Sequence, residues 1–195
     1  MGSSTQYDLA YDQIRSLLKL PRIGQIGYVV DDVYHTIKQQ NVTHKNVSWL
    51  VLDHDHQRSI AGKQGRCSLR IALAYKGSLQ LELIQVLKGD TIHVVARNAT
   101  DFPIHHLGFM VNNLEQHLKY CLVKGARLLQ KGTIKSSGIT VNYAYLDVSG
   151  IGGTNLVFEL IQWRLGLLPM PVNRYIFLFL LRLGSWNIFQ GKIVR

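Results

Sequence analysis

Four polar side chains interrupt apolar stretches of the sequence at positions that could together hold a metal ion. Glu82 and Glu159 each lie within a run of large apolar residues, and Gln25 and His106 each stand directly before an apolar–glycine–aromatic step. A buried carboxylate is destabilising unless it is paired, hydrogen-bonded or bound to a metal. Two carboxylates, one imidazole and one amide oxygen suit an octahedral or square-pyramidal site for a borderline divalent cation such as Zn, Ni, Co or Mn. We therefore expect such a cation to be held by Gln25, Glu82, His106 and Glu159.

An internal repeat relates these four residues, any one of which alone would more often face solvent. Residues 23–33 align with residues 104–114 at an offset of 81, so that apolar positions match and Gly27 coincides with Gly108. Residues 79–85 align with residues 156–162 at an offset of 77, and both contain Glu-Leu-Ile-Gln. Because a repeat determines the architecture of a whole chain, each copy is expected to supply two of the four ligands.

Each copy predicts the order strand, helix and three strands. The opening strands are residues 26–30 and 107–111, and paired Asp31-Asp32 and Asn112-Asn113 are typical N-caps for the helices that follow. Gly125 suits the end of the second helix, because glycine readily adopts the left-handed conformation found there. The remaining strands are expected near residues 47–53, 68–74 and 78–86 in the first copy, and near residues 127–130, 141–147 and 155–162 in the second.

The predicted fold is α+β, with two paired βαβββ modules that form a curved mixed sheet around a central cleft. We place an N-terminal helix in residues 1–21, the first module in 22–103, the second in 104–163 and an apolar, basic tail in 164–195. Because side chains alternate between the two faces of a strand, inward-facing polar residues would converge in the cleft.

Over residues 22 to 163 the chain resembles the vicinal-oxygen-chelate superfamily, which includes glyoxalase I, methylmalonyl-CoA epimerase, extradiol dioxygenases and bleomycin-resistance proteins. The resemblance implies metal ligands on the first and last strands of each module, at Gln25, Glu82, His106 and Glu159. This ligand set is similar to that of some glyoxalase I enzymes. The local sequences 105–109, 112–114 and 152–160 are closer to the epimerase branch, in which His usually stands where this chain has Gln25.

The resemblance implies a metal-dependent isomerase, epimerase or lyase that moves a proton next to a carbonyl, on a substrate such as a CoA thioester or a glutathione adduct. A divalent metal would act as Lewis acid, and a carboxylate would carry the proton. Our hypothesis makes Glu159 the proton-transfer base, with Glu82 as its counterpart. A metal-free ligand-binding or scaffold protein is the alternative. An extradiol-type dioxygenase is less favoured, because its first ligand would be a histidine at the position of Gln25.

Three further groups of polar residues are interpreted as structural. The run Asp53-His54-Asp55-His56 is expected in a solvated loop between strands. His105 is expected to point away from the metal, because neighbouring strand residues face opposite sides. A basic turn is expected to form a solvated surface that could meet a phosphate, and it comprises Lys63, Arg66 and Arg70.

The formal net charge of +10 does not predict nucleic-acid binding, because half of it lies after Glu159 and no recognition motif is present. We expect a small anionic carbonyl compound as the ligand, and no nucleic acid. The apolar segment 175–181 predicts a helix that must be covered. Packing on its own sheet is favoured, a homodimer is possible, and peripheral membrane contact aided by Trp186 is not favoured. Without an apolar N-terminal run, the chain is expected to be cytoplasmic.

Overall fold

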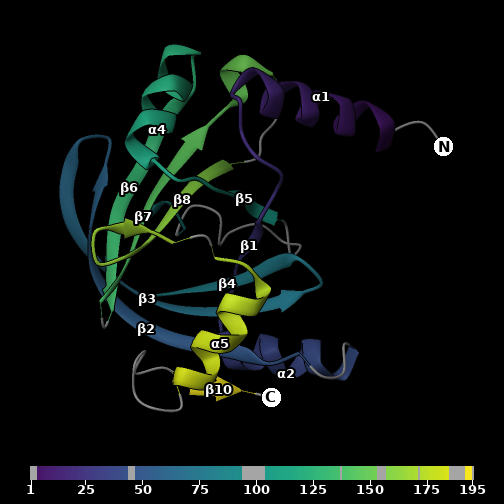
Figure 1. The fold of residues 1–195 in the computed structure, drawn as a ribbon, viewed down its shortest axis with the longest axis vertical. Helices are drawn as coiled ribbons and strands as arrows, with labels where there is room; N and C mark the ends of the chain where they lie inside the picture. Colours follow the sequence, from purple (N-terminus) through teal and green to yellow (C-terminus); the bar gives the residue numbers. More distant parts are fainter. Residues whose placement is uncertain are drawn as a thin grey trace.

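The computed structural model describes residues 4–43, 47–93, 104–136, 138–152, 157–170, 172–184 and 192–194. Two βαβββ modules follow one another along the chain (Figure 1). The elements of the first module are β1 (Gln25–Val29), α2 (Val33–Thr43), β2 (Trp49–Ile60), β3 (Lys63–Lys76) and β4 (Leu79–Lys88). Those of the second are β5 (Ile104–Met110), α4 (Leu114–Val123), β6 (Arg127–Ser136), β7 (Ile139–Asp147) and β8 (Val157–Leu165). The predicted α+β fold of two such modules is confirmed.

The strands form one mixed sheet that closes on itself. Its order is β10 (Lys192–Val194), β2, β3, β4, β1, β5, β8, β7 and β6, and a further pairing between β2 and β6 closes the ring. Within each module the first and last strands are parallel, and the antiparallel pairing of β1 with β5 joins the modules. The first and last strands of both modules therefore lie side by side, so residues from all four can meet inside the barrel.

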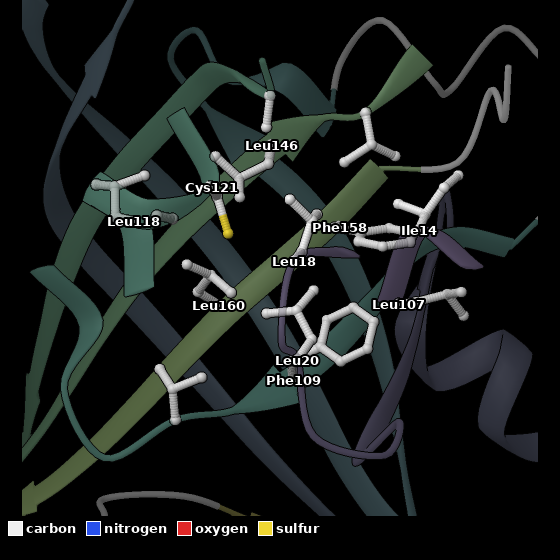
Figure 2. Close-up of a cluster of buried hydrophobic side chains, with 14 of the residues drawn as sticks. Ile14, Leu18, Leu20, Leu107, Phe109, Leu118, Cys121, Leu146, Phe158 and Leu160 are labelled. Atoms are coloured by element: carbon white, nitrogen blue, oxygen red, sulfur yellow. The ribbon is translucent and has the colours of Figure 1, made fainter. Parts of the chain in front are cut away.

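Alternating side chains give each of these strands an inner and an outer face. On β8, Phe158 and Leu160 belong to an outer apolar cluster, whereas Glu159 and Ile161 line the cavity inside the barrel. In the outer cluster, helices α1 (Ser4–Leu17) and α4 pack on strands of the second module (Figure 2). Helix α2 contributes to the corresponding outer cluster on the first module. The helices therefore cover apolar outer faces of the sheet, while the inner faces form a second apolar cluster around the polar centre.

Helix α4 begins and ends as the sequence predicts. The Asn113 side chain accepts a hydrogen bond from the backbone N–H of Gln116, which satisfies one of the free donors of the first turn. Past the C-terminus, Gly125 has φ +100°, the left-handed conformation that glycine adopts readily. Local capping therefore determines where this helix starts and stops.

The C-terminal region adds β9 (Leu168–Pro169), α5 (Arg174–Gly184) and β10 (Lys192–Val194). As favoured from the sequence, α5 packs on its own sheet: Phe177 is 2% exposed and lies among inward-facing residues of the barrel. Tyr175 and Phe179 of the same helix are exposed. Gly153 and Trp186 lie outside the described residues. Among the helices that are described, none combines the length and the hydrophobicity needed to cross a bilayer.

The prediction of a loop at residues 53–56 was wrong. These residues lie within β2, where they pair with β3 from Asp53↔Arg70 to His56↔Cys67. Asp53 and Asp55 are exposed, Asp53 forms an ion pair with Arg70 at 2.7 Å, and His56 is buried. Side chains of this run alternate between the two faces of the sheet, as in any strand. The face that meets solvent is polar, and this polarity made the run look like a loop.

Candidate metal centre

Two neighbouring rows of paired residues cross the centre of the barrel. One row contains Glu82, Gly27 and His106. The adjacent row contains Gln80, Gln25, Gly108 and Glu159. In each row a glycine separates polar residues that come from different strands. The sheet pairing thus brings all four predicted ligands to one place on the inner surface.

The imidazole of His106 lies between the two carboxylates. Its Nε2 atom is 3.1 Å from Oε2 of Glu82 and 3.1 Å from Oε2 of Glu159. Ligand atoms of these three residues all lie within 4.8 Å of one another. His106 has no exposed surface, and both glutamates are buried. The predicted Glu-His-Glu group is therefore assembled in the interior from three strands of two modules.

Each of the four residues predicted as ligands has a buried side-chain atom that lacks a hydrogen-bond partner. These atoms are Oε1 of Gln25, Oε2 of Glu82, Nε2 of His106 and Oε2 of Glu159. The 3.1 Å contacts of His106 are close enough for electrostatic attraction, but neither has hydrogen-bond geometry. Buried polar atoms are normally paired, so an unpaired group of three oxygens and one nitrogen has the chemistry of a cation site.

Gln80 orients the amide of Gln25. The Gln25 Nε2 atom donates a hydrogen bond to Oε1 of Gln80 at 3.0 Å, which leaves Oε1 of Gln25 free to act as a ligand. Gln25 lines the same cavity as Glu82 and Glu159. Gln80 has no exposed surface and was not singled out from the sequence. Gln80 therefore fixes the Gln25 amide so that its oxygen, rather than its nitrogen, is available to bind a metal.

The two glycines of the repeat make room for the ligands. A Cβ atom on Gly27 would overlap the imidazole ring of His106. A Cβ atom on Gly108 would lie 2.7 Å from Oε1 and 2.8 Å from Cβ of Gln25. Each module therefore supplies the glycine over which the ligand of the other module lies. This explains why the two glycines coincide in the repeat.

Burial and charge act in opposite directions on the central groups. Burial disfavours the protonated form of His106, but the attraction of Glu159 and Glu82 outweighs it and raises the pKa to about 9. Burial raises the pKa of Glu159 despite the opposing effect of His106. Without a cation, the two carboxylates thus hold a proton on the imidazole. With one bound, His106 must release that proton in order to coordinate.

His105 does not point away from the centre, contrary to the sequence prediction. The pairing of β1 with β5 shifts register between Gly27 and Tyr28, and the bulge places an extra residue on β5. A bulge lets two successive side chains lie on the same side of a strand. The Nδ1 atoms of His105 and His106 are 3.0 Å apart, so His105 contacts the ring nitrogen of His106 that faces away from the carboxylates.

Two further buried aromatic residues surround the centre and were missed from the sequence. Tyr145 lies with its ring centroid 5.2 Å from that of His106, and it is paired with Glu159 across β7 and β8. His93 stacks near both Tyr145 and His105. The only available signal for Tyr145 was the weak match of Ala144-Tyr145 with Ala74-Tyr75 in the two copies. No local pattern distinguishes His93.

The centre opens into a small cavity of about 80 Å³ whose walls are mainly aliphatic. Phe177 of α5 also lines it and contacts Tyr75 at a centroid distance of 5.0 Å. A separate, larger cavity of about 970 Å³, here called the outer cavity, is lined mainly by polar and basic residues. His56 and Tyr143 line both cavities, and their side chains are 2.9 Å apart at Nε2 and the hydroxyl oxygen.

The sequence profile of the Glyoxalase/Bleomycin resistance protein/Dioxygenase superfamily matches residues 24–143, which include most of both modules. This chain belongs to that superfamily. The resemblance inferred from the four residues and the repeat is therefore confirmed. A comparison with curated proteins finds no significant relative.

Solved structures of methylmalonyl-CoA epimerases share the fold of this superfamily member. The enzyme from Mycobacterium tuberculosis is 19% identical with a TM-score of 0.50, and the match covers 73% of this chain and 87% of that one. An epimerase in complex with methylmalonyl-CoA and ammonium is 18% identical with a TM-score of 0.53, covering 78% and 99%. A Streptomyces coelicolor variant bound to 2-nitronate-propionyl-CoA is 19% identical with a TM-score of 0.52, covering 73% and 96%. At these identities the likeness concerns the fold.

Proposed function

We propose that this protein is a metal-dependent enzyme that moves a proton next to a carbonyl group, as an isomerase, epimerase or lyase. The observation that carries the proposal is the set of four buried, unpartnered polar atoms on Gln25, Glu82, His106 and Glu159. Burying such atoms without a partner is destabilising, and a cation would compensate all four at once. The fold shared with methylmalonyl-CoA epimerases supports the same class of reaction.

The four residues would hold a divalent ion such as Zn, Ni, Co or Mn. When bound, the ion acts as a Lewis acid on the carbonyl oxygen of the substrate. Glu159 is the proposed base that removes the neighbouring proton and returns it, and Glu82 is its counterpart from the other module. Burial raises the pKa of Glu159, which makes this carboxylate a stronger base than an exposed one. Tyr145 lies beside Glu159, where β7 pairs with β8.

The proposed substrates are carbonyl compounds whose neighbouring carbon carries an acidic hydrogen. Because the structural neighbours are complexes with CoA derivatives, a CoA thioester is one candidate, and a glutathione adduct is another. The proposal includes an intracellular site of action and allows a homodimer.

A metal-free binding or scaffold protein is the second candidate, and one observation favours it. Two carboxylates lie 3.1 Å from an imidazole whose pKa is raised to about 9, so the group can retain a proton without a metal. The two candidates differ in metal content. A dioxygenase is less favoured, because Gln25 supplies an amide oxygen where a second histidine would be needed.

Metal analysis of the purified protein, before and after incubation with each divalent ion, is the first test. The enzyme proposal predicts about one ion per chain, which is lost in His106→Ala. Absence of binding for every ion would favour the scaffold candidate. Hydrogen–deuterium exchange next to the carbonyl, followed by NMR for a panel of thioesters, then tests the reaction.

Glu159→Gln tests the proposed base separately from the metal. The amide keeps an oxygen at nearly the same place but cannot accept the proton, so we expect metal to be retained in large part and exchange to be abolished. Glu115→Gln is the matched control, since Glu115 is an exposed carboxylate on α4, 3.6 Å from Lys131. Full exchange activity in Glu159→Gln would show that another group is the base.

A further inference from the structure

The wall of the barrel cavity contains no fixed positive charge among the described residues. Ten leucine, isoleucine and valine side chains line it, together with Trp163 and Phe177. The polar residues of the wall gather at the metal centre and at the edge formed by His54 and His56. A carboxylate group buried without a cationic partner loses its hydration and gains nothing in return.

The polar groups that do face this cavity contribute no net positive charge. Burial lowers the pKa of His54, and it lowers the pKa of His56 to about 4, so both are neutral at pH 7. An anion in the cavity would therefore find no basic side chain in the described part of the wall with which to pair.

Basic residues line the second, larger cavity instead, and one of them, Arg58, is itself buried, with its Nε donating a hydrogen bond to the backbone oxygen of Asp90 at 2.6 Å. Five such residues line this outer cavity of about 970 Å³, in which the acidic residues are Asp55 and Glu115. They are Arg58, Arg66, Lys131, Lys135 and Arg164. The positive charge that could attract an anion thus contacts the outer cavity and not the reaction centre.

We propose that the part of the substrate that enters the barrel is an uncharged aliphatic carbonyl group, and that this site discriminates against a second carboxylate on the reacting carbon. The proposal rests on the proposed function for the identity of the reacting end. It differs from what the structural neighbours suggest, since methylmalonyl-CoA carries such a carboxylate. The anionic carbonyl compound predicted from the sequence would then carry its negative charge away from the reacting carbon.

The small cavity is consistent with a short aliphatic group. A cavity needs at least about 10–15 Å³ to hold one water molecule, so 80 Å³ leaves room for a small group only. Phe177 of α5 is buried and forms part of the same wall. A branched group of three or four carbons would contact aliphatic side chains on all sides, which is the environment that favours it most.

A matched pair of ligands tests this preference without relying on turnover. S-methyl thioisobutyrate and the S-methyl monothioester of methylmalonic acid differ only in that a carboxylate replaces one methyl group. Binding to the full-length protein is measured by NMR of isoleucine methyl groups, and shifts at Ile139 and Ile161 locate the ligand in the cavity. We expect the neutral thioester to bind at least about tenfold more tightly, because nothing in the cavity compensates the buried charge.

Two arginine variants provide the converse test. Val141 lines the cavity and is half-buried, whereas its neighbour Thr140 faces the other side of β7 and lines neither cavity. Val141→Arg should tighten binding of the carboxylate ligand by about tenfold, since the guanidinium can pair with it. Thr140→Arg adds the same charge on the opposite face and should leave the preference unchanged.

The outcomes separate this inference from the proposed function. Equal or tighter binding of the carboxylate ligand to the wild-type protein would overturn the inference, and so would the absence of binding by the neutral thioester at the cavity isoleucines. Neither result depends on metal content or on exchange of the carbon-bound hydrogen. Conversely, a protein that prefers the neutral ligand but holds no metal and exchanges no hydrogen would retain the inferred preference and lose the proposed function.

Discussion

Replacing either glycine of the repeat with alanine should damage the metal centre without touching a ligand. A glycine in the middle of a strand is normally a weak point, and alanine there is expected to stabilise the fold by about 0.4–1 kcal/mol when space allows. At Gly27 the added methyl group would overlap the imidazole of His106, and at Gly108 it would press on Gln25. A gain in stability would therefore follow the general rule, whereas a loss of stability and of metal affinity would follow from the contacts of these two glycines.

The required displacement follows from the contacts. At Gly108 the added Cβ would lie 2.7 Å from Oε1 of Gln25, whereas ordinary contact begins at 3.4 Å, so the amide must move by about 3.4 − 2.7 = 0.7 Å. Metal–ligand distances tolerate only about 0.2 Å. We expect Gly108→Ala to weaken metal binding by about 10- to 100-fold. Gly27→Ala should have a larger effect, because the ring itself must leave its place, and overpacking should destabilise the fold by about 1–3 kcal/mol.

Competition with a chromophoric chelator measures the metal affinity, and thermal unfolding in metal-free buffer measures the stability separately. Gly150→Ala is the control: the nearest atom to its added Cβ is 3.9 Å away, and Gly150 has no positive φ. Wild-type metal affinity in Gly27→Ala would refute the reasoning, because His106 could then not be lying over this glycine when it binds the ion.

Three further predictions concern stability and reactivity. Because burial lowers the pKa of His56 to about 4 from its ordinary 6.5, the unfolded chain takes up this proton first as the pH falls. The free energy of unfolding should therefore fall between pH 6.5 and 4, by at most about 3 kcal/mol more in the wild type than in His56→Gln. Urea unfolding at both pH values measures this difference, and equal decreases in the two proteins would argue against a neutral, buried His56. Phe177→Ala should destabilise the protein by about 3–5 kcal/mol, and Phe179→Ala on the exposed side of α5 should change little, so similar melting temperatures for the two variants would contradict the packing of α5. Burial raises the pKa of both thiols, that of Cys121 to about 11, and therefore neither Cys67 nor Cys121 should react with a maleimide until the protein unfolds, which mass spectrometry can follow. Rapid labelling of the folded protein would show that these cysteines are accessible.

The repeat made the fold and the four candidate ligands predictable from the sequence. Apolar alternation identifies strands locally, and two copies of the same pattern show which polar interruptions are equivalent. Gln25, Glu82, His106 and Glu159 could therefore be selected together before any contact was known. The capping residue Asn113 and the terminal Gly125 were equally readable, because their effects depend on the nearest turn of helix.

Other features were not predictable, because they depend on pairings between distant segments. The contact of His105 with His106 depends on a bulge opposite Gly27, and β2 extends through Asp53 to His56 because β3 pairs with it over that length. The role of Gln80 depends on its meeting Gln25 across β1 and β4. Each of these residues looks like an ordinary surface residue when only its neighbours in sequence are considered.

The sequence by itself determined which residue types recur at equivalent positions, since strand periodicity and repeats are local properties of the chain. Only the tertiary structure decided that β1 and β5 pair, that each glycine lies under the ligand of the other module, and that Phe177 rather than solvent bounds the cavity. It also decided that the basic residues flank the outer cavity while the interior around the carboxylates is aliphatic. The physical reason is that burial and charge environment are set by what packs around a residue, and in a closed barrel those neighbours come from remote strands.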